Sequence, residues 1–360
     1  MAEKAYLILA DGSVFTGRAV GAKGTSVGEL IFDTGMSGYQ EALSDPSFYG
    51  QIVMFTYPLI GNCGINDEDS ESDKSYLRGI VVKELVNFGN NYRMKGTIGD
   101  YLEKQNIIAI EGVDTRAITR KLRDNGTMNA VITTEELTFS DVKDKLCEYK
   151  ITGAVEETSC KEIYKVGEGK LSVGLIDYGQ KKAFIESLVK RGVSVTVYPE
   201  STDADTILKA KHNGIMLSNG AGDPAILTKQ IETVKKLADA KIPMFGVSLG
   251  HQILALANGF KTYKLSYGHH GGNHPVTDLA KGKTYITAQN HGYAVCSDSV
   301  DTSIAEISYK NLNDNTVEGL KYKNTPAFSV QFAPDGCPGP KETAYLFDEF
   351  VSLMGGKKNA

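Results

Sequence analysis

The sequence predicts an α/β protein with two domains, a β-rich N-terminal domain followed by a doubly wound, mostly parallel sheet. Its 360 residues exceed what one core of ordinary size needs. Residues 1–150 alternate short strand-like runs with Gly-rich turns, whereas strands and helices alternate at short spacing from residue 171 onward. We therefore expect domains at 1–150 and 171–355, joined by a polar connector at 151–170.

The composition excludes several classes of protein. Hydrophobic residues at 41% and charged residues at 23% are typical of a soluble globular protein. A net charge of −5 does not favour binding to nucleic acid or to an anionic membrane. No apolar run reaches the ~18 residues of a membrane span, and the short apolar start predicts a strand rather than a signal peptide. The five scattered cysteines predict neither a disulfide framework nor a zinc cage and favour a reducing cytoplasm.

In the N-terminal domain, short apolar runs bounded by turns predict strands, and one run with helical spacing predicts a helix. The helix is expected at Asp114–Arg123, where Asp114 or Thr115 can cap the start and Gly126 lies just beyond the end. Strands are expected at Tyr6–Leu9, Leu30–Phe32, Gln51–Thr56 and Gly79–Val82.

The C-terminal domain has the rhythm of βαβ units, which predicts a parallel sheet covered by helices on both faces. Ligands of such sheets lie at the carboxyl ends of the strands, so the loops at 217–224 and 245–252 are expected to carry a site. Strands are expected at Leu171–Tyr178, Val193–Tyr198, Gly214–Ser218 and Pro243–Val247, and helices at Lys182–Lys190, Ala204–Ala210, Ala225–Ala240 and Leu249–Ala257.

The pentapeptide from Gly246 to Gly250 has the pattern Gly-x-Ser-x-Gly and lies between a predicted strand and a predicted helix. A sharp turn there would lift Ser248 above the sheet, and the helix N-terminus would offer N–H groups to an oxyanion. The glycines permit the close approach of strand and helix. Gly220 and Gly222, on the neighbouring loop, could add further N–H donors. The alternative is an ordinary turn with a capping serine.

Segments from both domains resemble a known family. Those of the C-terminal domain are similar to the class I glutamine amidotransferase domain: Leu217–Pro224, Phe245–Gln252, Gly268–Pro275 and Thr287–Tyr293. Those of the N-terminal domain resemble the domain found in the small subunit of carbamoyl phosphate synthase: Thr34–Glu41, Asp45–Ser47, Thr56–Asn62 and Gly112–Arg116. The resemblance covers nearly all of residues 1–355.

The resemblance implies a Cys-His-Glu triad for glutamine hydrolysis, and all three positions differ in this sequence. They are occupied by Ser248, Ala333 and Asp335. A serine hydroxyl is a poor nucleophile without a base, and Ala333 provides none. Loss of the nucleophile or base of a comparable triad costs roughly 10⁶ in rate. We therefore expect glutamine hydrolysis to be lost; the sequence leaves open whether the changes are natural or engineered.

The resemblance also implies a glutamine pocket and a partner. The partner would be a large, ATP-using subunit that makes carbamoyl phosphate for pyrimidine and arginine synthesis, with ATP and Mg²⁺ on that subunit and no cofactor or metal in this chain. This chain would then be a scaffold or regulatory subunit of an ammonia-using synthase. The implied glutamine-binding positions are Ser47, Gly220, Gly222, Leu249, Gln252, Asn290, Gly292 and Tyr293.

Two other functions stay open. An active glutaminase would need a displaced base. His251, on the elbow helix, is expected to point away from the strand ends, and the other histidines of this domain belong to family-like segments with other placements: His269, His270, His274 and His291. A serine hydrolase built on the elbow would lack the usual Ser-Asp-His order, because no histidine follows His291. A metal site at His269 and His270 is disfavoured, since adjacent histidines in a Gly-rich loop fit no common zinc pattern.

Overall fold

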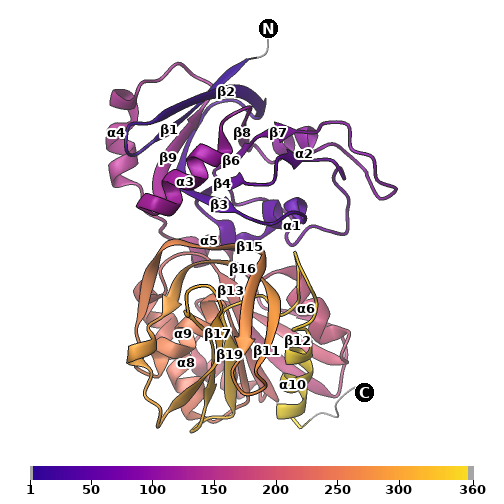
Figure 1. The fold of residues 1–360 in the computed structure, drawn as a ribbon. Coiled ribbons are helices and arrows are strands. Elements are labelled where there is room, and N and C mark those ends of the chain that lie inside the picture. Colours follow the sequence, from indigo (N-terminus) through magenta and orange to yellow (C-terminus); the bar gives the residue numbers. More distant parts are fainter. Residues whose placement is uncertain (1–2, 356–360) are drawn as a thin grey trace. The chain divides into compact units, whose positions relative to one another are not determined.

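The computed structural model describes residues 3–355 and divides into two compact units (Figure 1). The first unit extends to Thr152 and also includes Ser266–Gly271, and the second unit begins at Gly153. The segment predicted as a connector, 151–170, contains the short helix α5 (Ala154–Thr158) and the strand β10 (Tyr164–Val166). β10 pairs antiparallel with the strand that starts at Val193, so this segment extends the sheet of the second unit.

The first unit is a closed barrel of seven strands in the order β1-β2-β8-β6-β4-β3-β9. Closure leaves no strand edge exposed for pairing with another chain. All four strands predicted in this domain are present, and three more complete the barrel. The strands are β1 (Lys4–Leu9), β2 (Val14–Gly21), β3 (Thr25–Asp33), β4 (Gln51–Phe55), β6 (Gly79–Val82), β8 (Ile108–Glu111) and β9 (Met128–Thr133).

Two sets of barrel side chains pack against different helices. One set, which includes Ile52 and Ile110, is clustered with Leu122 of α3 (Thr115–Asn125). The other set, which includes Val53, is clustered with Leu102 of α2 (Ile98–Lys104). The remaining elements of the first unit are α1 (Tyr39–Ser44), η1 (Pro46–Phe48), α4 (Phe139–Glu148) and the paired strands β5 (Leu59–Ile60) and β7 (Glu84–Leu85).

Helix α3 forms where the sequence predicted it. The Asp114 side chain accepts a hydrogen bond from the Ala117 N–H (2.9 Å), and Gly126 follows the last helical residue with a positive φ of 86°. Ile118 and Leu122, one turn apart, are fully buried.

The second unit contains a ten-stranded sheet in the order β10-β12-β11-β13-β14-β19-β18-β16-β15-β17. The five strands from β12 to β19 in this order run parallel, which confirms the predicted doubly wound centre, and β18 and β17 continue it antiparallel. The strands are β11 (Leu171–Tyr178), β12 (Val193–Pro199), β13 (Gly214–Gly220), β14 (Met244–Val247), β15 (Thr262–Asp278), β16 (Lys283–Val295), β17 (Ala305–Asn311), β18 (Val317–Tyr322) and β19 (Ala327–Val330).

Helices cover the two faces of this sheet with separate cores. One core contains buried side chains of α7, α8 and α9, such as Ile207, Val234 and Ile253. The other contains Phe184 of α6 and Phe347 of α10. The helices are α6 (Lys182–Val189), α7 (Ala204–Lys209), α8 (Thr228–Asp239), α9 (Leu249–Ala257) and α10 (Tyr345–Leu353), with 3₁₀ turns η2 (Pro224–Ile226) and η3 (Ser297–Ser299).

One predicted helix is divided in the structure. The run expected at Ala225–Ala240 begins as the separate turn η2, which Asp223 caps by accepting from the Ala225 N–H (2.9 Å). Leu227 then leaves helical geometry, with ψ at 53°, before α8 starts at Thr228. None of the helices in residues 3–355 is both long and apolar enough to cross a membrane.

Truncation of Leu122 tests the packing of α3 on the barrel. Leu122 is completely buried in the cluster with Ile52 and Ile110, so Leu122→Ala should lower the free energy of unfolding by about 2–5 kcal/mol. Val14→Ala is the control, because Val14 is 48% exposed and its truncation should cost under about 0.5 kcal/mol. Urea unfolding followed by circular dichroism measures both; similar losses in the two variants would contradict this packing.

Candidate active site at the carboxyl ends of the parallel strands

Ser248 forms a strained turn between β14 and α9. It has φ 52° and ψ −108°, a conformation that a non-glycine residue rarely adopts. Its N–H donates to the carbonyl of Val330 at the end of β19 (2.9 Å), which anchors the turn to the neighbouring parallel strand. Backbone strain of this kind costs about 1–3 kcal/mol and gathers at functional sites. The sharp strand-to-helix turn predicted from the Gly-x-Ser-x-Gly pattern is therefore present.

The glycines around Ser248 are required by close packing. A Cβ on Gly250 would lie 2.4 Å from the carbonyl oxygen of Leu217 on β13, and a Cβ on Gly246 would lie 2.8 Å from the carbonyl oxygen of Gly250. On the adjacent loop, a Cβ on Gly220 would lie 2.3 Å from the Tyr178 carbonyl oxygen. Because all three distances are too short for carbon and oxygen, side chains at these positions would push α9 and the loop away from the strands.

Two glutamines lie beside Ser248. Gln252, on α9, donates from Nε2 to the Tyr293 carbonyl (2.7 Å) and to the Gln331 Oε1 (2.9 Å). Gln331 follows β19, and its Nε2 is 3.5 Å from the Ser248 Oγ, a weak hydrogen bond at best. Both N–H groups of Gln252 are thus used within the protein. The Gln252 Oε1 accepts no hydrogen bond within residues 3–355. This oxygen is therefore the side-chain atom of Gln252 that can bind a ligand.

Ala333 presents only a methyl group. Its backbone is fixed, because its N–H donates to the Ala288 carbonyl (2.8 Å) and the two alanines form an isolated antiparallel bridge. The segment that follows β19 is therefore tied to β16 through the backbone. At position 333 no side-chain atom can accept or release a proton.

Asp335, two residues further, forms a buried ion pair. Its Oδ2 is 2.8 Å from the Lys181 Nζ, and the two side chains are 1% and 2% exposed. The Cys337 N–H donates to the same oxygen (3.2 Å), and the Lys181 ammonium also donates to the Cys337 carbonyl. The second carboxylate oxygen of Asp335, Oδ1, is buried without a hydrogen-bond partner among the described residues. Such an atom is costly to bury without a partner.

The histidine of the elbow helix does not supply a base. His251 is fully buried, its Nδ1 is 2.8 Å from the Ser329 Oγ, and burial lowers its pKa to about 3. A group with that pKa is neutral near pH 7 and is a weak proton acceptor. His251 therefore lies in the interior of the unit, bonded to β19.

The His291 ring is held by hydrogen bonds to residues of its own strand, β16. Its Nδ1 is 2.7 Å from the Tyr293 carbonyl oxygen, and its Nε2 is 2.8 Å from the Gln289 Oε1. Both ring nitrogens therefore have partners on β16. His269 and His270 belong to the segment that joins the first unit, where the His270 carbonyl accepts from the Thr34 N–H (3.0 Å).

The predicted glutamine-binding positions are distributed over both units. Ser47 lies in the first unit, where its N–H and Oγ both donate to the Asp45 Oδ1 (2.8 and 2.7 Å). The other seven lie in the second unit: Gly220, Gly222, Leu249, Gln252, Asn290, Gly292 and Tyr293. Of these, Gln252 and the Tyr293 carbonyl are brought together directly.

Sequence reasoning missed Lys181 and Gln331 as site residues. Gln331 leads the same segment as Ala333 and Asp335, so its place at the strand end could have been inferred. Lys181 follows β11, the neighbour of β13, and parallel strands bring their carboxyl ends to one edge of the sheet. Its partner is 154 residues away in the sequence, so no local pattern could indicate the ion pair.

Together these contacts form a sharp strand-to-helix elbow at which the one side-chain hydrogen bond of the Ser248 hydroxyl within residues 3–355 is to the Gln331 amide. The N-terminus of α9 presents backbone N–H groups that can stabilise a developing oxyanion. The Ser248 hydroxyl is 3.5 Å from the Gln331 Nε2, an amide that cannot take a proton from it. Binding and polarisation of a carbonyl are possible in this arrangement.

Comparison with known proteins agrees with both units. The family model "Carbamoyl-phosphate synthase small chain, CPSase domain" matches residues 7–132, and "Glutamine amidotransferase class-I" matches residues 174–353. A glutamine amidotransferase structure from Thermotoga maritima is 16% identical with a TM-score of 0.37, and it covers 46% of this chain and 76% of its own.

Two curated relatives are similar over nearly their whole length. The carbamoyl phosphate synthase small chain of Clostridium acetobutylicum is 47% identical over 97% of this chain and 100% of its own, and that of Listeria monocytogenes is 43% identical over 99% and 98%. Identity at this level across both units shows that the chain belongs to the carbamoyl phosphate synthase small-chain family and carries a class I glutamine amidotransferase domain.

Proposed function

We propose that this chain is a scaffold or regulatory small subunit of a carbamoyl phosphate synthase that uses free ammonia, and that its own glutamine-hydrolysing step is lost. The observation that carries the proposal is the absence of a proton acceptor at Ala333, beside a serine where the family resemblance implies a cysteine. The large subunit would hold ATP and Mg²⁺ and make carbamoyl phosphate. We place the complex in the cytoplasm and in pyrimidine and arginine synthesis.

The nucleophile is the first obstacle to hydrolysis. A cysteine is partly thiolate near neutral pH, whereas a serine hydroxyl must lose its proton to a base as it attacks. The Gln331 amide, 3.5 Å from the Ser248 Oγ, can only donate or accept a hydrogen bond and cannot take the proton. The strained turn at Ser248 therefore presents a group that this site cannot activate.

The base is the second obstacle. The resemblance places a histidine at position 333, oriented by a carboxylate two residues later. Asp335 retains a carboxylate there, and its buried Oδ1 lacks a partner within the described chain, as expected where an imidazole N–H has been removed. Its other oxygen is engaged by Lys181, which keeps the carboxylate in place without the histidine. These contacts favour loss of chemistry over a rearranged triad.

The two rival functions lack support in the side-chain geometry. A displaced base would have to lie close to Ser248, but His251 is held in the core with a pKa of about 3 and His291 uses both ring nitrogens on β16. A serine hydrolase would need the same missing base. The active-glutaminase alternative therefore requires a group that no contact of Ser248 identifies.

Restoring nucleophile and base together tests the proposal. With the large subunit present, the unsubstituted chain, Ser248→Cys and Ala333→His should each release negligible glutamate from glutamine, because the two groups act as a unit. The rate of glutamate release by Ser248→Cys/Ala333→His should exceed that of every single variant by roughly 10³-fold or more. A triple variant that adds Asp335→Glu tests whether a longer carboxylate side chain orients the imidazole better.

The matched control is Ser248→Ala/Ala333→His, which has the imidazole but no nucleophile and should stay inactive. Glutamate release is measured in parallel with ammonium-dependent carbamoyl phosphate formation. Ordinary amidotransferase rates in the unsubstituted chain, or full activity from Ser248→Cys alone, would mean that a base exists and that the proposal is wrong.

Glutamine binding should outlast the loss of chemistry. The glycine loops, the Gln252 oxygen and the N-terminus of α9 are all in place, so we expect calorimetry to detect L-glutamine binding at millimolar concentration or better. A hundredfold excess over Kd should stabilise the protein by about 2.7 kcal/mol. D-glutamine is the control ligand and should give no shift. If saturating L-glutamine produced neither heat nor thermal stabilisation, retention of the pocket would be refuted.

A further inference from the structure

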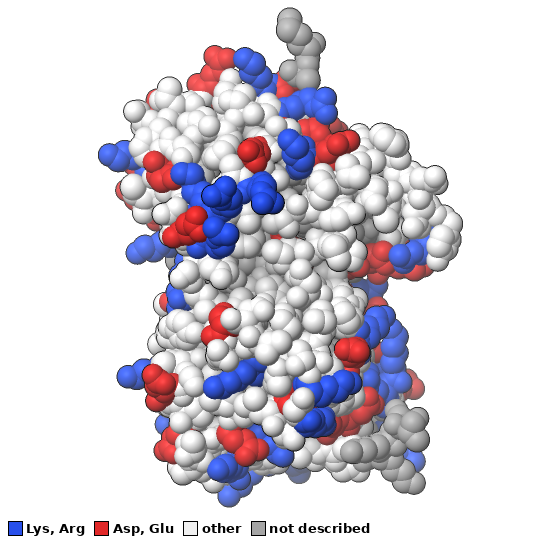
Figure 2. All heavy atoms as spheres, in the orientation of Figure 1, with Lys and Arg blue, Asp and Glu red and all other residues white. Residues whose placement is uncertain are grey.

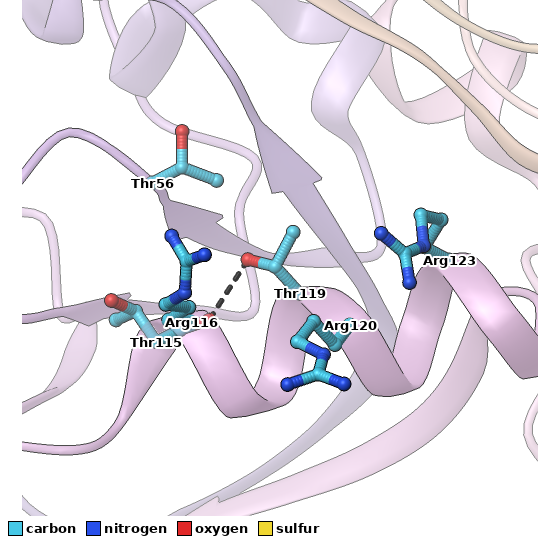
Figure 3. Close-up of a pocket in the computed structure, with 6 residues that line it drawn as sticks. All are labelled: Thr56, Thr115, Arg116, Thr119, Arg120 and Arg123. Carbon is cyan, nitrogen blue, oxygen red and sulfur yellow. Dashed lines mark hydrogen bonds between the residues drawn. The ribbon is translucent and has the colours of Figure 1, made fainter.

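The first unit has a pocket of its own beside α3. It is open to solvent and has a volume of about 480 Å³, within the range of small-ligand sites. Figure 3 shows Arg116 extending from the helix toward Thr56, which precedes the strand pair β5 and β7 in the chain. The pocket is lined by Thr56, Thr115, Arg116, Thr119, Arg120 and Arg123.

The charge of this pocket is positive and largely uncompensated. Arg116, Arg120 and Arg123 follow one another at helical spacing, and Arg116 and Arg120 have no ion-pair partner among residues 3–355. By contrast, Lys121 on the same helix is 2.6 Å from Asp11, and Arg123 pairs with its neighbour Asp124 (2.8 Å). Figure 2 shows Lys and Arg side chains gathered on the face of the first unit that carries α3.

This arrangement opposes the stability of the helix. Like charges four residues apart, as in Arg116 and Arg120, destabilise a helix. Arg116 also lies in the first turn of α3, where the helix dipole favours negative charge. An anion in the pocket would offset both effects, so the pattern is explained by a ligand better than by folding.

The donors available to a ligand are mainly guanidinium groups. The Thr56 hydroxyl donates to the Asp33 carbonyl (3.0 Å), and the Thr119 hydroxyl donates to the Thr115 carbonyl (2.8 Å), so these protons are already used. Guanidinium groups form paired hydrogen bonds with phosphate oxygens and remain charged at every physiological pH. The volume exceeds that of a single phosphate and suits a diphosphate or a phosphate ester.

We propose that the α3 pocket binds a small phosphate-bearing anion, of the diphosphate or nucleotide class, through Arg116 and Arg120. This site lies wholly within the first unit and contains none of the residues of the Ser248 elbow. The proposal is therefore independent of whether glutamine is hydrolysed. It gives the N-terminal unit a ligand-binding role in addition to any part it has in assembly.

Calorimetry of the full chain with inorganic pyrophosphate at low ionic strength tests the proposal. The unsubstituted chain should bind saturably, and Arg116→Gln/Arg120→Gln should bind roughly 100-fold more weakly, about tenfold per guanidinium. The control is Lys143→Gln/Lys145→Gln on α4, which removes two exposed positive charges outside the pocket and should bind as the unsubstituted chain does. Circular dichroism checks that all variants are folded.

Two results would overturn the proposal. The first is no saturable binding of pyrophosphate, or an equal Kd in the arginine variant and the unsubstituted chain. The second is that the unsubstituted chain does not bind pyrophosphate, while replacement of Arg116 and Arg120 weakens its binding to the large subunit. The pocket would then bind acidic side chains of a protein.

Discussion

The close approach of helix α9 to the parallel strands is the constraint on which the site in the second unit depends. Gly250 lies so near the Leu217 carbonyl that even a methyl group could not fit, at 2.4 Å. This contact holds the start of α9 at the carboxyl ends of β13 and β14 and places Ser248 in its strained turn. The elbow is thus a property of backbone packing, and it persists whichever nucleophile or base the side chains supply.

The buried pair of Lys181 and Asp335 explains how the remainder of the site stays in order. Removing one partner of a buried ion pair is strongly destabilising, whereas the intact pair with extra hydrogen bonds is tolerated. Because the pair joins the start of α6 to the loop after β19, it fixes that loop without a contribution from residue 333. The loop therefore keeps its position with an alanine at residue 333, while Asp335 Oδ1 has no hydrogen-bond partner among the described residues.

The parts of the fold that could be predicted from sequence are those with local causes. β6, β11 and α9 have the predicted bounds, because each is an apolar run ended by a turn or a glycine. Barrel closure and the antiparallel strands beyond β19 depend on pairings between distant residues, which no short pattern encodes. The long strand β15 contains Gly268–Gly272, for which the glycines and adjacent histidines predict only a loop.

The site, like the fold, has some features with a local cause in the sequence and others that depend on contacts between distant residues. The elbow at Ser248 followed from a five-residue pattern with a steric cause. The commitment of the Gln252 N–H groups to Tyr293 and Gln331 depends on contacts across 41 and 79 residues, and only the structure reveals it. The α3 pocket was also missed, although three arginines at helical spacing in a predicted helix were visible as a charged stripe.

The acidity of a thiol at the elbow is the most direct test of the central claim that no proton acceptor lies beside residue 248. The pH dependence of iodoacetamide alkylation, followed at that residue by mass spectrometry, gives the thiol pKa in Ser248→Cys and in Ser248→Cys/Ala333→His. An adjacent imidazole lowers a thiol pKa strongly, whereas a helix N-terminus acts on both variants alike. We expect the double variant to have a pKa lower by about one unit or more. Equal thiol pKa values in the two variants would contradict the account, because the restored imidazole would then add nothing that the site lacks.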